Sequence, residues 1–176
     1  AWFVDMQRDT PPADTEPGWR QVTLLDNWYT SHRQDDFPAW YRMDFDIHTT
    51  QGVWSVYLPA VNSNAVVWLN GERIGDGGRM QEPVARNWHR PLFFHVPRNL
   101  LRPGKNSLYV QLRPKNSGFG YLGQVHIGPE AVLRPVFETA TLYKQMLIGA
   151  SAVLLLCFSI FISMLWLKRR QDSLYG

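Results

Sequence analysis

The sequence predicts an all-β protein, a β-sandwich of jelly-roll type, followed by one transmembrane α-helix. Two observations support this prediction. Residues 1–130 contain short segments in which apolar and polar residues alternate, separated by Gly, Pro and Asn, as is typical of antiparallel strands that bury one face. Residues 146–167 then form a stretch of 22 residues without a charged side chain.

The first 22 residues are expected to be irregular or to form an edge segment. They contain the string PPADTEPG, and proline lacks the amide hydrogen that an interior strand must donate. The first clear strand covers residues 41–48, where four apolar residues alternate with four polar ones. One face of this strand should therefore lie in the core and the other in water.

A hairpin is predicted for residues 65–75. The segment AVVWL at 65–69 is strongly β-prone. The Asn70-Gly71 pair that follows it suits a type I′ turn, because both central residues of that turn need positive φ. The segment VWSVYL at 53–58 is equally β-prone and is expected to form a strand before the hairpin.

Three further strands complete the predicted sandwich. Apolar residues alternate in PLFFHVP (91–97) and in SLYVQL (107–112), and PGKN (103–106) supplies a turn between them. A last strand is expected in QVHIG (124–128). Such a series of short strands is typical of a jelly roll. Residues 131–141 are expected to form a short connector into the membrane helix, stiff enough to transmit movement.

Met146–Leu167 is the most specific feature of the sequence. As a helix its 22 residues would be about 33 Å long, enough for a hydrocarbon core of about 30 Å. A buried helix of this length in a soluble domain would normally have a polar face, and a signal peptide would lie at the N-terminus. The segment is therefore predicted to cross a membrane.

The charged residues predict how this helix is oriented. The chain has 18 Lys and Arg and 15 Asp and Glu residues, but residues 1–143 hold 14 of each sign. The excess of +3 thus lies beside the apolar segment, at Lys144 and in the cluster 168–170, less the negative charge of Asp172. Because basic flanks stay in the cytoplasm, residues 1–143 are expected outside. Their balanced charge argues against a nucleic-acid partner.

The outer domain has no cysteine, since the single Cys157 lies in the apolar segment. It must therefore be stable without disulfides, which suits a bacterial periplasm. We expect that it was exported by a leader that has since been removed. We expect an inner-membrane protein with a periplasmic domain (1–140), a transmembrane helix (141–167) and a short basic cytoplasmic tail (168–176) at which a longer chain is truncated.

Five strings follow one another between residues 19 and 129: LLDNW (24–28), PAWYRMDFDI (38–47), YLPAVNSNAVVWLNGERIG (57–75), NWHRPLFFHVPRNLLRPGKNSLYVQL (87–112) and GYLGQVHIGP (120–129). In this order they resemble the galactose-binding-like jelly roll. That fold includes the noncatalytic N-terminal sandwich of beta-galactosidase-type glycosidases. The resemblance implies a fold and says little about a ligand.

A sandwich followed directly by a membrane helix and the tail KRRQDSLYG is similar to the start of bacterial seven-transmembrane receptors with diverse intracellular signalling modules. The resemblance implies a sensor domain with a histidine kinase or diguanylate cyclase further along the chain. One span and nine following residues would then make this chain a fragment. The alternative is a membrane-anchored carbohydrate-binding or adhesion module without a signalling role.

No enzymatic activity, metal or cofactor is expected for these residues. HExxH, CxxC, GxSxG and GxxxxGK[ST] patterns do not occur, and the five histidines have no i,i+2 or i,i+4 partners. Asp44 and Asp46 would share a strand face, but Arg42 and His48 beside them indicate a solvated charged face. Gly75–Gly78 lacks the lysine and helix that a phosphate loop needs.

The loop 76–91, DGGRMQEPVARNWHRP, is the candidate ligand site, because sandwiches carry binding residues on such end loops. An indole can stack on a sugar ring, while Arg, Asn and Glu provide directional hydrogen bonds. Alternatively, Trp88 closes the end of the core and the arginines keep the loop soluble. The candidate residues are Arg79, Glu82, Arg86, Asn87, Trp88, His89 and Arg90.

The expected partners are the membrane and a small-molecule or carbohydrate ligand. Ser159 and Ser163 lie four residues apart, a spacing of small residues that lets helices approach closely. This spacing suits either a homodimer or packing with further transmembrane helices, and simple exposure to lipid is the alternative.

Overall fold

A computed structural model describes residues 1–31, 38–87, 90–114 and 119–175 of the chain. The chain divides into two compact units, Ala1–Glu138 and Thr139–Gly176. All strands of the described residues belong to the first unit, and the second contains most of a single long helix. The predicted domain boundary at residue 140 stays a prediction.

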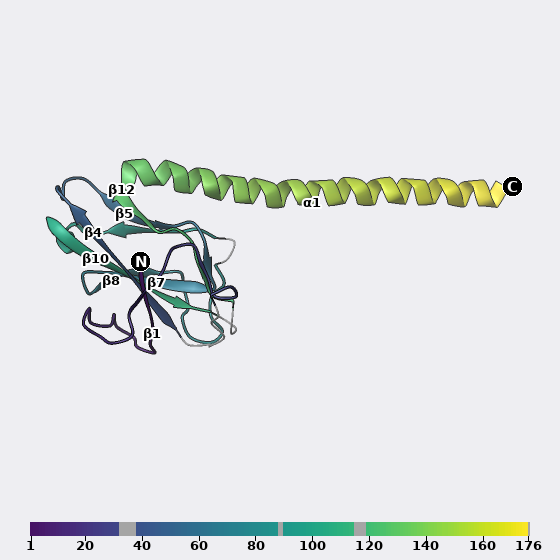
Figure 1. Cartoon of the computed structure of the whole chain (residues 1–176). Coiled ribbons are helices and arrows are strands. Elements are labelled where there is room, and N and C mark those ends of the chain that lie inside the picture. The colour runs from purple at the N-terminus through teal and green to yellow at the C-terminus, as the bar shows by residue number, and fades with distance from the viewer. Residues whose placement is uncertain (32–37, 88–89, 115–118, 176) are drawn as a thin grey trace. The chain divides into compact units, whose positions relative to one another are not determined.

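The largest sheet has six strands, and every neighbouring pair in it is antiparallel. In spatial order its strands are β2 (Arg20–Gln21), β1 (Trp2–Asp5), β4 (Ala39–Ile47), β10 (Gly104–Arg113), β7 (Asn64–Leu69) and β8 (Glu72–Asp76). Figure 1 shows the long strands β4 and β10 of this sheet. Their pairing runs from Ala39 opposite Leu112 to Ile47 opposite Gly104.

Two smaller antiparallel sheets complete the sandwich. One contains β12 (His126–Pro129), β5 (Trp54–Leu58) and β9 (Leu92–Val96), in that order. The other contains β3 (Asp26–Asn27), β11 (Tyr121–Leu122) and β6 (Val61–Asn62). A short 3₁₀ helix, η1 (Arg98–Leu100), lies between β9 and β10.

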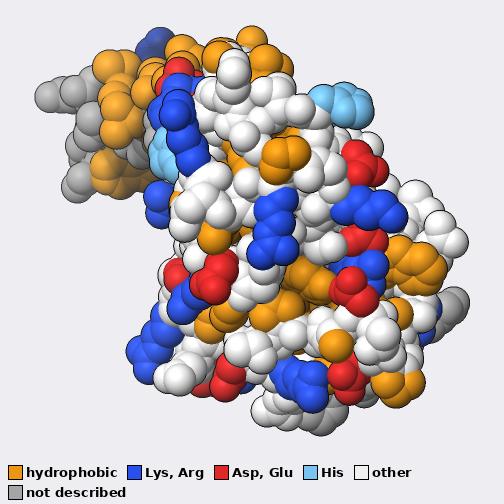
Figure 2. Space-filling view, turned by 90° about the vertical axis from the view of Figure 1, so that its left-hand side faces the viewer, with side chains coloured by type: hydrophobic (Ala, Val, Ile, Leu, Met, Phe, Trp, Pro, Cys, Tyr) orange, Lys and Arg blue, Asp and Glu red, His pale blue; other side chains and the backbone are white. Residues whose placement is uncertain are grey.

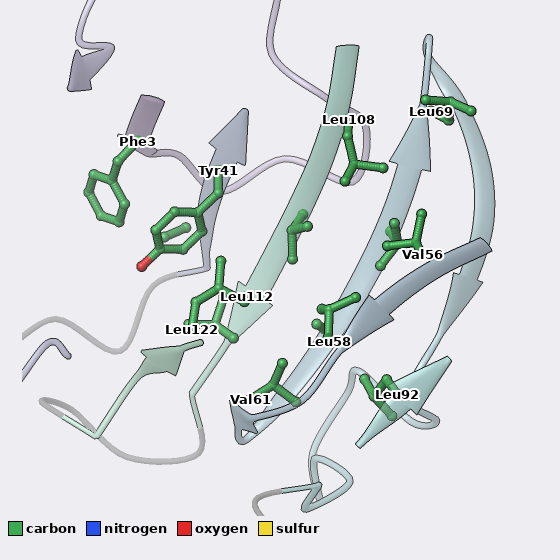
Figure 3. Close-up of a cluster of buried hydrophobic side chains, with 14 of the residues drawn as sticks. Phe3, Tyr41, Val56, Leu58, Val61, Leu69, Leu92, Leu108, Leu112 and Leu122 are labelled. Atoms are coloured by element: carbon green, nitrogen blue, oxygen red, sulfur yellow. The ribbon is translucent and has the colours of Figure 1, made fainter. Parts of the chain in front are cut away.

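The core lies between these sheets. Phe3, Tyr41 and Leu108 reach it from the six-stranded sheet, and Val56 and Leu58 from β5, as Figure 3 shows. Each of these side chains is buried, because inward-facing residues alternate with outward-facing ones along each strand. The predicted all-β sandwich of jelly-roll type is confirmed.

The predicted hairpin is also confirmed. Its two strands, β7 and β8, are antiparallel, and the turn residues Asn70 and Gly71 have φ of 52° and 91°. The Asn70 side chain donates to Leu100 O at 2.7 Å and to Asn106 Oδ1 at 2.8 Å. A local turn signal therefore also fastens the hairpin to the next turn of the sandwich.

The expected turn at 103–106 was wrong from Gly104 onward, because β10 begins at that residue. Asn106 is a buried strand residue whose Nδ2 donates to Arg102 O at 2.6 Å and to Gly104 O at 2.9 Å. Its side chain forms the hydrogen bonds of the turn, although the residue itself lies in the strand. This explains why asparagine, a typical turn residue, occurs at this position.

The N-terminal prediction was wrong for Trp2–Asp5. This segment is strand β1, and it pairs with β4 on one side and with β2 on the other. Phe3 enters the main core while Val4 is buried on the opposite face. The prolines that argued against a strand begin only at Pro11, and they follow β1 rather than interrupt it.

Residues 6–19 cover part of the outer face of the six-stranded sheet. Met6 and Trp19 pack there against Val4, Trp40 and Tyr109. Gln111 Nε2 donates to Arg8 O at 2.6 Å and anchors the segment. The predicted wet face is confirmed at Asp44, Asp46 and His48, which are exposed, whereas Arg42 is half-buried.

Helix α1 extends from Glu130 to Tyr175 and follows β12 directly. The connector expected at 131–141 is therefore helical, and residues 130–138 belong to the sandwich unit. Within the described residues, this helix is long and apolar enough to cross a membrane, with a mean hydropathy of 2.4 in its most apolar window.

Candidate functional site

The structure describes five of the seven predicted site residues, and Trp88 and His89 lie outside the described residues. Arg79, Glu82, Arg86 and Arg90 are exposed on the loop 76–91, whereas the fifth, Asn87, is buried. Exposure suits ligand binding, and burial indicates that Asn87 has another task.

Asn87 fastens the loop to strand β7. Its Nδ2 donates to Asn64 Oδ1 and to Gly77 O, each at 2.8 Å, and its backbone N donates to Ser63 O at 2.8 Å. Asn64 Nδ2 in turn donates to Gly78 O at 3.0 Å and to Arg79 O. Because buried amides with satisfied hydrogen bonds rigidify their surroundings, these two side chains set the shape of the loop.

The glycines of this region allow close packing. A Cβ on Gly77 would lie 2.2 Å from Asn64 Oδ1, and a Cβ on Gly75 would lie 2.4 Å from the Phe94 ring. Glycine is therefore required where the backbone approaches the amide pair and the core. This close packing explains the glycine-rich segment Gly75–Gly78, so no bound phosphate is needed to explain it.

A cavity of about 350 Å³ lies at the base of the loop. Asp76 and Arg90 line it from the loop, Phe93 and Phe94 from β9, and Phe137 from the start of α1. Its volume is at the lower end of the range for small-molecule sites. Arg90 is the single member of the described predicted set that lines this cavity.

The cavity combines hydrogen-bonding groups with aromatic surface. Asp76 forms an ion pair with Arg73, and its Oδ1 accepts from the backbone N of Gly78 at 2.7 Å. Arg90 offers guanidinium donors, Asp76 offers carboxylate acceptors, and phenylalanine rings supply an apolar wall. This arrangement can bind a small ligand that has both hydroxyl groups and an apolar face.

The first turns of α1 are fixed to the sandwich beside the cavity. Glu130 Oε2 accepts from Ser55 Oγ at 3.0 Å and lies 2.6 Å from His95 Nδ1. The Phe137 ring lies 5.0 Å from that of Phe93, centroid to centroid. Ser55 and His95 contact the same carboxylate oxygen of Glu130, so these contacts attach the start of the helix to strands β5 and β9.

The aromatic wall is not evident from the sequence patterns. They place Phe93 and Phe94 in a strand and Phe137 in the connector. Glu130, Leu133 and Phe137 are half-buried at a helical i, i+3, i+7 spacing. That spacing is visible in the sequence and would have predicted an amphipathic helix that packs on the sandwich.

Charges of both signs are interspersed over the face in Figure 2, with apolar side chains between them. This face therefore has no broad basic surface of the kind that binds nucleic acid. In the described part of the chain, no three His, Cys, Asp or Glu side chains gather as a metal ion would require.

No family model and no curated protein matches the chain. Among solved structures it is similar to a glycosyl hydrolase family 2 member from Bacteroides cellulosilyticus, with 17% identity, a TM-score of 0.51, and coverage of 73% of this chain and 20% of that one. A family 2 beta-galacturonidase from Eisenbergiella tayi has 18% identity, a TM-score of 0.49, and coverage of 73% and 22%.

The chain spans about a fifth of the length of these enzymes. At this level of identity the similarity shows the fold alone. The fold is a β-sandwich of the type that occurs as one domain in family 2 glycosyl hydrolases, in agreement with the galactose-binding-like resemblance. In this chain it is followed by one helix with the length and composition of a membrane span.

Proposed function

We propose that this chain is the extracytoplasmic ligand-sensing domain and first membrane span of a bacterial signal-transduction receptor. One observation carries the proposal: Phe137 is both a wall of the ligand-sized cavity and a residue of helix α1. A ligand in the cavity would therefore contact the loop, the sheet and the helix at once. A histidine kinase or diguanylate cyclase further along the chain would be the output.

Signalling requires that the ligand distinguish two arrangements of the helix start. A ligand shifts an equilibrium only by its difference in affinity between the two states. A group that occupies the cavity would favour the Phe137 position that leaves room for it. The contacts of Glu130 with Ser55 and His95 hold the helix start in one of these two arrangements. Ligand binding would either strengthen these contacts or release them.

A saccharide is the proposed ligand class. Sugar hydroxyls can donate to Asp76 and accept from Arg90, while the C–H face of the ring packs on phenylalanine. We propose binding without catalysis, because Asp76 is the one carboxylate among the described residues that line the cavity, and glycoside hydrolysis generally uses two.

The proposed location is the bacterial inner membrane, with the sandwich in the periplasm. The basic cluster at 168–170 and the single Lys144 at the other end of the apolar segment support this orientation.

The binding test uses the full chain in lipid nanodiscs and an array of neutral and acidic saccharides. We expect at least one saccharide to bind and Arg90→Gln to weaken that binding at least tenfold. Arg86→Gln is the matched control, since it removes an exposed arginine of the same loop that does not line the cavity. Binding that both variants leave unchanged would contradict the cavity as the site.

The signalling test measures amide hydrogen exchange in residues 130–138 with and without the saccharide found in the array. A sensor should change protection there on binding, and Phe137→Ala should reduce this response more than it reduces affinity. Saccharide binding that leaves exchange at 130–138 unchanged would favour the membrane-anchored binding or adhesion module instead.

A further inference from the structure

A second cavity, of about 440 Å³, lies on the outer side of the six-stranded sheet. It shares no described lining residue with the cavity at Phe137. Residues 10–12 of the N-terminal segment form one wall. The hairpin turn Asn70-Gly71 and the residues Arg102 and Lys105 contribute to the other. A Cβ built on Gly71 would meet nothing within 4 Å, so the cavity is open beside the turn.

Two exposed cations, Arg102 and Lys105, line this cavity. Within the described residues, neither the Arg102 nor the Lys105 side chain forms an ion pair or a hydrogen bond, and both residues are exposed. The backbone of Arg102 is held in place by Asn106, because its N donates to Asn106 Oδ1 at 3.0 Å and its O accepts from Asn106 Nδ2 at 2.6 Å. The guanidinium therefore extends from a fixed turn.

The two carboxylates near the cavity, Asp14 and Asp44, share Arg42 as their ion-pair partner. Asp44 accepts from Arg42 Nε at 3.0 Å and from Ser107 Oγ at 2.8 Å. The hydrogen bond from Arg42, followed by that from Ser107, holds the pKa of Asp44 below its usual value against the effect of burial, and the charges of Arg42 and Lys105 add to this lowering. Asp14 Oδ1 lies 3.1 Å from Arg42 Nη1 and accepts a hydrogen bond from the Tyr109 hydroxyl.

Tyr109 adds no negative charge to the lining. Burial, followed by the hydrogen bond to Asp14, raises the pKa of its phenol well above the usual value. Asp46 is opposite Lys105 in the ladder, but no ion pair within 4.0 Å joins them in the described structure. The described lining therefore contains two positive charges that form no ion pair within 4.0 Å, and no carboxylate.

We propose that this cavity binds the carboxylate or phosphate group of a small, sugar-sized anion. A guanidinium offers a planar pair of donors that fits both groups, and the lysine ammonium adds a second charge. Pro11, Pro12 and the Tyr109 ring supply an apolar wall for the rest of the ligand. This site is independent of the proposed sensor cavity.

The test measures binding of inorganic phosphate, D-glucuronate and D-glucose to the full chain in nanodiscs of zwitterionic lipid at low salt. At least one of the two anions should bind, while glucose, which lacks the charge, should bind at least tenfold more weakly at this site. Added salt should weaken the binding of the anion. Phosphate binding alone identifies a phosphate ester as the ligand, and glucuronate binding identifies an acidic sugar.

Arg102→Gln and Lys105→Gln should each weaken the binding of the anion at least fivefold. Arg113→Gln is the matched control, because it removes a cation eight residues along β10 from Lys105, about 27 Å away. Binding of neither anion, or equal binding by all three variants, would overturn the proposal. Arg90→Gln should leave anion binding intact, so failure here is distinct from failure of the sensor cavity.

Discussion

Replacing Trp28 with phenylalanine should destabilise the sandwich more than the same replacement of Trp40. Both indoles are 0% exposed. Trp28 Nε1 donates to the Tyr41 hydroxyl at 2.7 Å, and that hydroxyl donates to Asp26 Oδ2 at 2.7 Å. Trp40 Nε1 has no hydrogen-bond partner among the described residues. The two substitutions therefore remove similar ring volume but different polar contacts.

The expected difference follows from the free energies of these contacts. Truncating a buried Trp or Phe to Ala costs about 3–5 kcal/mol, so the smaller loss from Trp to Phe should cost about 1–2 kcal/mol at either position. Trp28→Phe also removes a buried hydrogen bond and leaves the Tyr41 oxygen without its donor, which adds about 1–3 kcal/mol. The expected totals are about 2–5 kcal/mol at Trp28 and about 1–2 kcal/mol at Trp40.

Pulse proteolysis in urea can measure the free energy of unfolding on the full chain in nanodiscs, without using tryptophan fluorescence. Equal losses in Trp28→Phe and Trp40→Phe would refute the contribution assigned to the hydrogen bond. Tyr41→Phe provides a second measurement, because it removes the acceptor of the same bond. The effects of Trp28→Phe and Tyr41→Phe should then be less than additive when the two are combined.

Two further predictions concern the loop and the outer face. Gly77→Ala should destabilise the sandwich by about 1–3 kcal/mol in the same assay, because the new Cβ would collide with the amides of Asn64 and Asn87; Gly149→Ala, where a Cβ meets nothing within 4 Å, is the control. The pKa of Asp44 is lowered from 3.8, so its stabilising contribution is complete above that value and is lost as the pH falls through the lower folded pKa. The stability difference between wild type and Asp44→Asn should therefore shrink in acid, and a difference that does not vary with pH would contradict this assignment.

Local sequence patterns predicted the parts of the fold that depend on neighbouring residues. The hairpin at 65–75 formed as expected because the Asn70-Gly71 pair sets its own turn geometry. The alternation at 41–48 placed Tyr41 in the core for the same local reason. The apolar segment 146–167 likewise needed only its length and composition to be recognised as a candidate membrane span.

Contacts between distant segments could not be predicted in this way. Strand β1 pairs with β4, which lies about 40 residues further along the chain. The prolines after Asp5 instead favoured the prediction of an irregular segment. Asn87 is a residue type that suits a ligand-binding loop, and only its hydrogen bond to Asn64 reveals a structural role. Whether a side chain is buried, and which groups it contacts, depends on the assembled fold, whereas its residue type is given by the sequence.

The sequence by itself determined an antiparallel sandwich, a helix with the length of a membrane span and the position of the candidate loop, since periodicity and turn chemistry are local. Only the tertiary structure decided which side chains surround a cavity. It brought Arg90, Phe93 and Phe137 together and placed Arg102 and Lys105 at one cavity on the outer face. The physical reason is that a cavity forms where strands, loops and helices from distant parts of the chain pack incompletely.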